Sequence, residues 1–229
     1  MARPLRLRPQ QEIDFSVISQ LSAERLEAVL ARLNRQKAPL IAASDLRSLI
    51  QDCLESEEQA LALARQLLGL ASYCRSANEE PKEAIESLLA SLRDTKLEEG
   101  EKTNLQKLAP ALRELLEHDY VNLSSKALHL GFDYANIYHS GNVITDIRPV
   151  FSDGKDKIVG AVISQTLRVH FSSGGQQQEL SLALDNDDIL ALRDACDEAL
   201  KKAASAKEMM IDKMDIKAFI VGEETYGLG

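Results

Sequence analysis

Two pairs of polar residues offer the clearest candidates for chemistry. Asp146 and Arg148 are separated by one residue in a stretch that reads as a β-strand, so both side chains point to the same face. Arg168 and His170 repeat this spacing on the next strand-like stretch. Because a guanidinium binds a carboxylate through two parallel hydrogen bonds, the four residues would make an anchor for a ligand or a protein partner. The alternative, which we favour, is a set of surface or interfacial ion pairs.

The histidines and cysteines lack the spacing of a metal site. The chain has four histidines and three cysteines: His118, His129, His139, His170, Cys53, Cys74 and Cys196. None of the histidines forms a His-x-x-x-His pair or stands at ligand spacing from a cysteine. We therefore expect no metal and no cofactor. Cys53 and Cys196 lie on apolar helix stripes, which predicts two buried thiols, and the odd cysteine count favours the reducing cytoplasm.

Sequence motifs for phosphate binding and for nucleophilic catalysis are missing. Gly174-Gly175 is an isolated pair that is typical of a hairpin turn, and the chain contains neither a P-loop nor a Gly-x-Ser-x-Gly elbow. The acidic run from Asp185 to Asp188 has no glycine turn of the kind that a calcium loop requires. We interpret the run as the cap of a helix, where carboxylates face the positive end of the helix dipole.

The charge of the chain disfavours nucleic acid as a partner. Its 229 residues carry a formal net charge of −9, and the only basic stretch is Arg3, Arg6 and Arg8. We interpret residues 1–20 as a partly disordered leader, and an arm that binds a partner is the alternative. No apolar run is long enough to cross a bilayer, so we expect no membrane partner.

Residues 21–131 predict an all-helical domain. Apolar residues recur there at positions i, i+3, i+4 and i+7, as in Leu26, Val29, Leu30 and Leu33 behind a Ser22 cap. The segment 57–73 is apolar on more than one side, which predicts a central helix. Pro110 should start or kink a helix. We expect five or six short helices.

Residues 135–214, called here the C-terminal module, predict three antiparallel strands followed by a long helix. The strands fall at 142–151, 158–171 and 179–184, and the alternating apolar residues give each an inward face. Pro149 indicates an edge strand or a bend. The fold class is therefore α+β. In the tail, residues 215–229, the apolar stretch 218–221 would add a strand or dock on a partner.

The sheet has a second apolar face that needs a cover. Ile144, Val150, Ile158 and Val162 point away from the inward face. One helix covers only one side of a sheet, so these residues must pack against the helical domain or against another subunit. We favour a homodimer formed through the C-terminal module.

The order of elements resembles the COMM-domain proteins, in which a helical N-terminal domain precedes a β-β-β-α module that forms intertwined dimers. The resemblance covers nearly the whole chain, and the segment 142–214 most closely. One departure is that the segment Asn142–Phe151 lacks the tryptophan that is usual in the first strand of that module. The resemblance implies self-association and an adaptor role rather than catalysis.

Two functions follow as hypotheses. In the first, the protein is a non-enzymatic scaffold that dimerises through the C-terminal module and presents its helical half to a protein partner. In the second, it is a small-ligand-binding regulator or an enzyme whose site lies between the helical half and the sheet, lined by Asp146, Arg148, Arg168 and His170.

Overall fold

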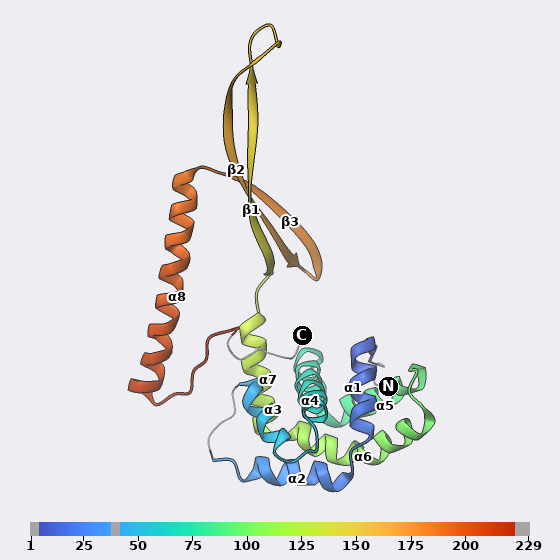
Figure 1. Ribbon diagram of the computed structural model, residues 1–229. Coiled ribbons are helices and arrows are strands. Elements are labelled where there is room, and N and C mark those ends of the chain that lie inside the picture. Colours follow the sequence, from blue (N-terminus) through green and yellow to red (C-terminus); the bar gives the residue numbers. More distant parts are fainter. Residues whose placement is uncertain (1–4, 38–41, 223–229) are drawn as a thin grey trace. The chain divides into compact units, whose positions relative to one another are not determined.

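The chain has an α+β fold that divides into two compact units (Figure 1). The computed structural model describes residues 5–37 and 42–222. The first unit comprises Met1–Gly131 together with Phe219–Gly229, and the second comprises Phe132–Ala218. The predicted fold class is confirmed, with helices first, then three antiparallel strands and a C-terminal helix.

The first unit is built from helices alone within its described residues. They are α1 (Pro9–Ser19), α2 (Ala23–Asn34), α3 (Ala43–Gln51), α4 (Glu57–Ala77), α5 (Pro81–Ser91), the 3-10 turn η1 (Leu92–Asp94), α6 (Glu99–Glu117) and α7 (Asp119–Phe132). Side-chain caps begin several of them: the hydroxyls of Ser22 and Ser56 accept the backbone N–H groups of Arg25 and Gln59.

The core of this unit forms around α4, as the apolar pattern predicted. Buried residues face several sides of α4, among them Leu63, Leu67 and Leu68. The apolar stripes of α2, α3, α5 and α6 supply most of the remaining core. A helix that is apolar on more than one side is stable only when neighbours surround it, and the other helices provide those neighbours.

The expectation of a partly disordered leader over residues 1–20 is wrong where the structure describes it. Residues 9–19 form α1, and Phe15 and Ile18 of this helix are buried in the core. Asp14 is also buried: its carboxylate lies 3.1 Å from a guanidinium nitrogen of Arg65 and accepts a 2.6 Å hydrogen bond from Gln66. The sequence did not predict this helix, because its apolar pattern is short and follows a stretch rich in arginine and proline. Arg3 lies outside the described residues.

Pro110 does not start a helix, contrary to one of the two predicted outcomes. Helix α6 begins at Glu99, where the Glu98 and Glu101 side chains form a reciprocal cap, and it continues through Pro110 to Glu117. Buried leucines on both sides of the proline, such as Leu108 and Leu112, hold the two halves of the helix in the same core. This packing offsets the missing hydrogen bond.

The second unit contains one three-stranded antiparallel sheet in the order β1-β2-β3. Strand β1 is Asn136–Phe151, β2 is Ile158–Ser173 and β3 is Gln176–Leu184. The predicted strands are all present, and β1 is an edge strand, as Pro149 indicated. Gly174 and Gly175 form the β2–β3 turn with φ angles of +58° and +80°, a region that glycine tolerates best.

Helix α8, Asn186–Met214, follows the sheet and begins at the predicted cap. The Asp185 carboxylate accepts the backbone N–H of Asp188, and Asp188 in turn accepts the N–H of Asp185. None of the residues of α8 is buried, so the expectation of a buried Cys196 is wrong.

The described part of the tail forms no strand. Phe219 and Ile220 are half-buried and belong to the first unit, where the side chain of Val221 approaches Gly131. The chain therefore returns to the helical unit after α8. The predicted extra strand is therefore absent from residues 215–222, and the alternative, docking on a partner, stays a prediction.

Candidate functional site

The register of the sheet brings the predicted inward residues to one face, called here the apolar face. Leu167 of β2 stands between Val143 of β1 and Leu182 of β3. Directly opposed residues of antiparallel strands share a face. The same face therefore carries Tyr138, Ile147, Ala161, Ile163, Val169, Phe171, Leu180 and Leu184. This arrangement matches the alternation in the sequence.

The opposite face divides into an apolar half and a polar half. Ile144, Val150 and Val162 lie on this face toward the β1–β2 turn, and their cross-strand partners are Thr166, Gly160 and Arg148. Ile158 pairs with Phe151 beyond a register shift at the end of the ladder. The predicted second apolar patch is therefore placed within the β1–β2 hairpin.

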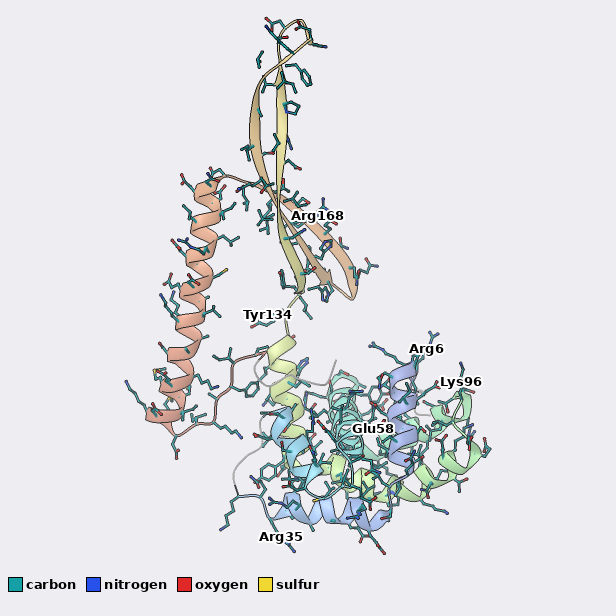
Figure 2. All side chains as sticks on the ribbon, in the orientation of Figure 1. Arg6, Arg35, Glu58, Lys96, Tyr134 and Arg168 are labelled. Carbon is teal, nitrogen blue, oxygen red and sulfur yellow. The ribbon has the colours of Figure 1, made fainter. Side chains whose placement is uncertain are left out.

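No described residue of the C-terminal module is buried. Figure 2 shows side chains standing out along both long strands and along α8. Seventeen large hydrophobic residues of residues 135–214 are exposed, with exposed fractions from 43% for Val150 to 71% for Ile147 and Leu200. Scattered apolar residues are normal on a protein surface, but a whole module without a buried side chain is not.

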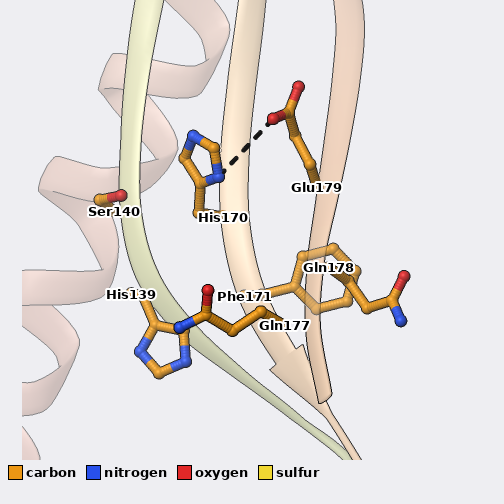
Figure 3. A pocket seen from close by; sticks show the side chains of 7 residues that line it. All are labelled: His139, Ser140, His170, Phe171, Gln177, Gln178 and Glu179. Atoms are coloured by element: carbon orange, nitrogen blue, oxygen red, sulfur yellow. Dashed lines mark ion pairs between the residues drawn. The ribbon is translucent and has the colours of Figure 1, made fainter.

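Arg168 and His170 are brought together by a residue that the sequence analysis did not single out. Glu179 of β3 lies opposite His170, with one carboxylate oxygen 3.3 Å from Nε of Arg168 and the other 3.8 Å from Nδ1 of His170. Figure 3 shows the His170 and Glu179 side chains facing each other across β2 and β3. The signal that could have found Glu179 is its place as the one acidic residue on the predicted third strand.

Asp146 and Arg148 lie on the same face but far from this cluster. Asp146 is opposite Ser164, four residues along β2 from Arg168, which corresponds to about 13 Å. Within the described part of the chain, neither residue forms an ion pair. The structure thus separates the four predicted site residues into two pairs and does not form a single anchor.

A shallow concavity of about 400 Å³ adjoins the Glu179 cluster. Its lining consists of His139, Ser140, His170, Phe171, Gln177, Gln178 and Glu179, and His139 is the extra residue at a register shift in β1. The carboxylate of Glu179 already lies 3.3 Å from the guanidinium of Arg168, so part of its charge is compensated within the chain. Among the described residues, no group of three or more His, Cys, Asp or Glu side chains is arranged to hold a metal ion.

Two of the three cysteines, Cys53 and Cys74, lack the environment of an activated nucleophile. Burial raises the pKa of the Cys53 thiol, and the nearby Asp52 carboxylate raises it further. Burial likewise raises the pKa of Cys74. Because the thiolate is the reactive form, these two cysteines are poor nucleophiles at neutral pH.

The sequence matches no protein-family model and none of the curated proteins with which it was compared. Of the helices in the described ranges, none is both long enough and apolar enough to cross a bilayer. The feature that stands out is the apolar surface that the strands and the helix of the C-terminal module leave exposed.

Proposed function

We propose that this protein is a non-enzymatic scaffold that self-associates through the C-terminal module. The observation that supports the proposal is that residues 135–214 expose apolar side chains on the sheet and on α8 while burying none. A three-stranded sheet needs a packed hydrophobic face to be stable in water, and a second copy of the module supplies one.

The exposed apolar surface of the whole module is comparable in area to one side of a stable dimer interface. A buried large aliphatic side chain contributes about 1.5–3 kcal/mol at about 25 cal/mol per Å², which corresponds to about 60–120 Å². Seventeen side chains that are about half exposed therefore offer on the order of 500–1,000 Å² per copy. A standard interface buries about 800 Å² per partner.

The long helix and the long strand of the module are of similar length, and each carries apolar residues. Helix α8 has 29 residues and a length of about 44 Å, and the 16 residues of β2 extend over about 53 Å. The helix carries an apolar stripe from Ile189 through Leu192 and Ala203 to Met210. In a two-fold dimer, the stripe of each α8 has an apolar sheet face to cover, and each surface occurs once in every copy.

Light scattering coupled to size-exclusion chromatography tests the proposal directly. We expect the mass of a dimer, about twice 25.3 kDa, at micromolar concentration. A protein that stays strictly monomeric over this range would refute self-association.

Removal of the module locates the interface. The first unit has its own core, so a chain that joins residue 131 to residue 219 through a short flexible linker should remain folded and become monomeric. The linker keeps Val221 beside Gly131, a contact that a simple truncation would lose. Persistent dimers of the shortened chain would place the interface on the helices.

We also infer that the protein works in a reducing compartment such as the cytoplasm. Cys53, Cys74 and Cys196 are all free thiols, and Cys196 is exposed on α8. An exposed free thiol is poorly suited to an oxidising compartment, where it would form disulfides between molecules.

A further inference from the structure

Strand β2 has an open edge where β3 ends. Strand β3 pairs with β2 from Ser173 to Gln165, where its last residue, Leu184, lies opposite Gln165. Strand β1 continues along β2 as far as Ile158. Residues 158–164 of β2 therefore have a neighbour on one side only, and in Figure 1 the β1–β2 hairpin extends beyond β3.

The position of Pro149 indicates which backbone N–H and C=O groups of β2 point away from β1, toward the open edge. Proline has no N–H, and in a sheet it occupies edge positions whose N–H would point away from the neighbouring strand. Pro149 lies opposite Ala161, so this pair is not hydrogen-bonded and the N–H and C=O of Ala161 point away from β1. The alternation repeats every second residue, so Ile163 also presents its backbone groups to the open edge.

The open edge lacks the usual protection against strand pairing. Residues 158–164, Ile-Val-Gly-Ala-Val-Ile-Ser, contain no charge and no proline. Sheets normally protect an edge with lysines, prolines or a covering element, and an apolar unprotected edge is a template for another strand. Side chains on both faces of the segment are exposed, among them Ile158, Val159 and Ile163.

Unpaired polar atoms mark the place where β3 leaves β2. A concavity of about 400 Å³ opens there, lined by Ile163, Ser164, Gln165, Leu184, Asp185 and Asn186. The hydroxyl of Ser164 and the side-chain carbonyl of Gln165 are shielded from solvent and have no hydrogen-bond partner within the described chain. Shielded polar atoms without partners are costly, so the β2–β3 junction is incompletely satisfied within the single chain.

We propose that the open edge pairs with the same segment of a second copy, antiparallel and centred on Ala161. This inference rests on the proposed self-association and specifies its geometry. In this register Val159 lies opposite Ile163 of the second copy, and Ala161 lies opposite its own counterpart on the two-fold axis. Opposed residues share a face, so the apolar faces of the two sheets become continuous, and the two α8 helices cover a common surface.

The charges at the ends of the segment favour a second copy over an unrelated peptide. In a register centred on Ala161, Ile158 of one copy lies opposite Ser164 of the other, so Lys157 comes next to the end of β3 at Leu184, where α8 begins. The β1–β2 turn contains Lys155 and Lys157 as well as Asp153 and Asp156, and the Asp156 carboxylate is engaged by the hydroxyl of Ser152 within the turn. Lys157 is the turn residue next to the paired segment, so the dimer brings its ammonium group toward the acidic start of α8 at Asp185, Asp187 and Asp188, and the two-fold axis repeats the contact.

Proline substitution tests the edge, with a matched control on another edge. Ala161→Pro removes an outward N–H of β2 and leaves the β1 ladder intact, so the dimer should dissociate with a Kd raised about 100-fold. Ala183→Pro is the control: Ala183 lies opposite Thr166, so its N–H points to the outer edge of β3, away from the proposed contact. The control should leave the Kd within about threefold of the parent value.

A cysteine at position 161 tests the register. In a full-length chain with Cys53, Cys74 and Cys196 replaced by serine, Ala161→Cys places two thiols across the axis, with Cα atoms about 5.5 Å apart. A short bismaleimide should join the copies, and it should not join copies that carry Ala183→Cys. The double substitution Lys155→Glu and Lys157→Glu should weaken the dimer about threefold to tenfold, and adding Asp187→Lys and Asp188→Lys should restore it.

The outcomes separate this inference from the proposed function. If the parent protein is a monomer, both fail. If the parent is a dimer that tolerates Ala161→Pro and does not cross-link through position 161, self-association stands and the edge pairing is overturned. If Ala161→Pro unfolds the chain, cross-linking and the charge exchange decide, and failure of both overturns the pairing.

Discussion

Ile163 and Ile147 are directly opposed on the apolar face, and their side chains are 67% and 71% exposed in the single chain. Replacing Ile163 by Thr keeps a β-branched side chain, so the strand preference is retained. Because the side chain has few neighbours to lose within the chain, the isolated subunit should lose little stability. If the face is buried in a dimer, however, the substitution removes an apolar contact twice, once in each copy.

The magnitude follows from the exposed fraction. Full burial of an isoleucine contributes about 1.5–3 kcal/mol, so burying the exposed two-thirds contributes about 1–2 kcal/mol per copy and about 2–4 kcal/mol per dimer. A tenfold change in Kd corresponds to about 1.4 kcal/mol. Ile163→Thr should therefore raise the dimer Kd by a factor of about 30 to 700.

Sedimentation equilibrium over a wide concentration range measures this change. Ile13→Thr is the matched control, because Ile13 is 55% exposed but lies on α1 in the helical unit. The control should leave the Kd unchanged. A parent dimer whose Kd moves less than threefold on Ile163→Thr would show that the apolar face lies outside the interface.

Three further predictions concern single residues. Asp14→Ala should lower the free energy of unfolding by about 3 kcal/mol in urea titrations, because it leaves the guanidinium of Arg65 beside an emptied buried site. The Nδ1 atom of His118 accepts the backbone N–H of Tyr120, and burial lowers the pKa of the His118 imidazole from the usual 6.5. Because the folded protein favours the neutral imidazole, the contribution of His118 to stability is present above pH 6.5 and is lost as the pH falls further. His118→Asn keeps a capping acceptor and should flatten the stability profile between pH 7 and 5; an unchanged slope would contradict this assignment. Gly175→Ala should destabilise the β2–β3 turn by about 1–2 kcal/mol, seen as a lower Tm, because a side chain at a φ of +80° is strained.

Periodicity predicted most of the fold because each element has its own signal. The alternation of Leu180, Leu182 and Leu184 fixed a strand and its inward face, and Asp185 fixed the start of α8. The same reasoning missed α1, because its apolar residues form a short pattern, of which only Phe15 and Ile18 are buried, beside a basic, proline-containing start. Helix propensity and charge are local, whereas the core that holds α1 is assembled from distant segments.

The candidate site was harder to predict from the sequence. Alternation along a strand shows which face of the sheet a side chain occupies, but the distance between side chains on two strands depends on the register of the strands. Alternation placed Asp146, Arg148, Arg168 and His170 on one face, and the structure agrees. The pairing of Asp146 with Ser164 then separates the first two from the last two, and a change of register by a few residues would have joined them. Glu179 becomes their partner only through the β2–β3 turn.

The exposure of the apolar side chains of the C-terminal module was the hardest feature to predict, because an apolar strand face has the same sequence pattern whichever element covers it. Alternating apolar residues on β1, β2 and β3 require a cover, and α8, which follows directly, was the obvious one. In the structure α8 buries none of its residues, so the apolar stripe of the helix and the apolar face of the sheet each require a partner of the same kind. The proposed self-association would cover both surfaces with one contact, because each copy would offer a sheet face to the partner's helix and a helix stripe to the partner's sheet.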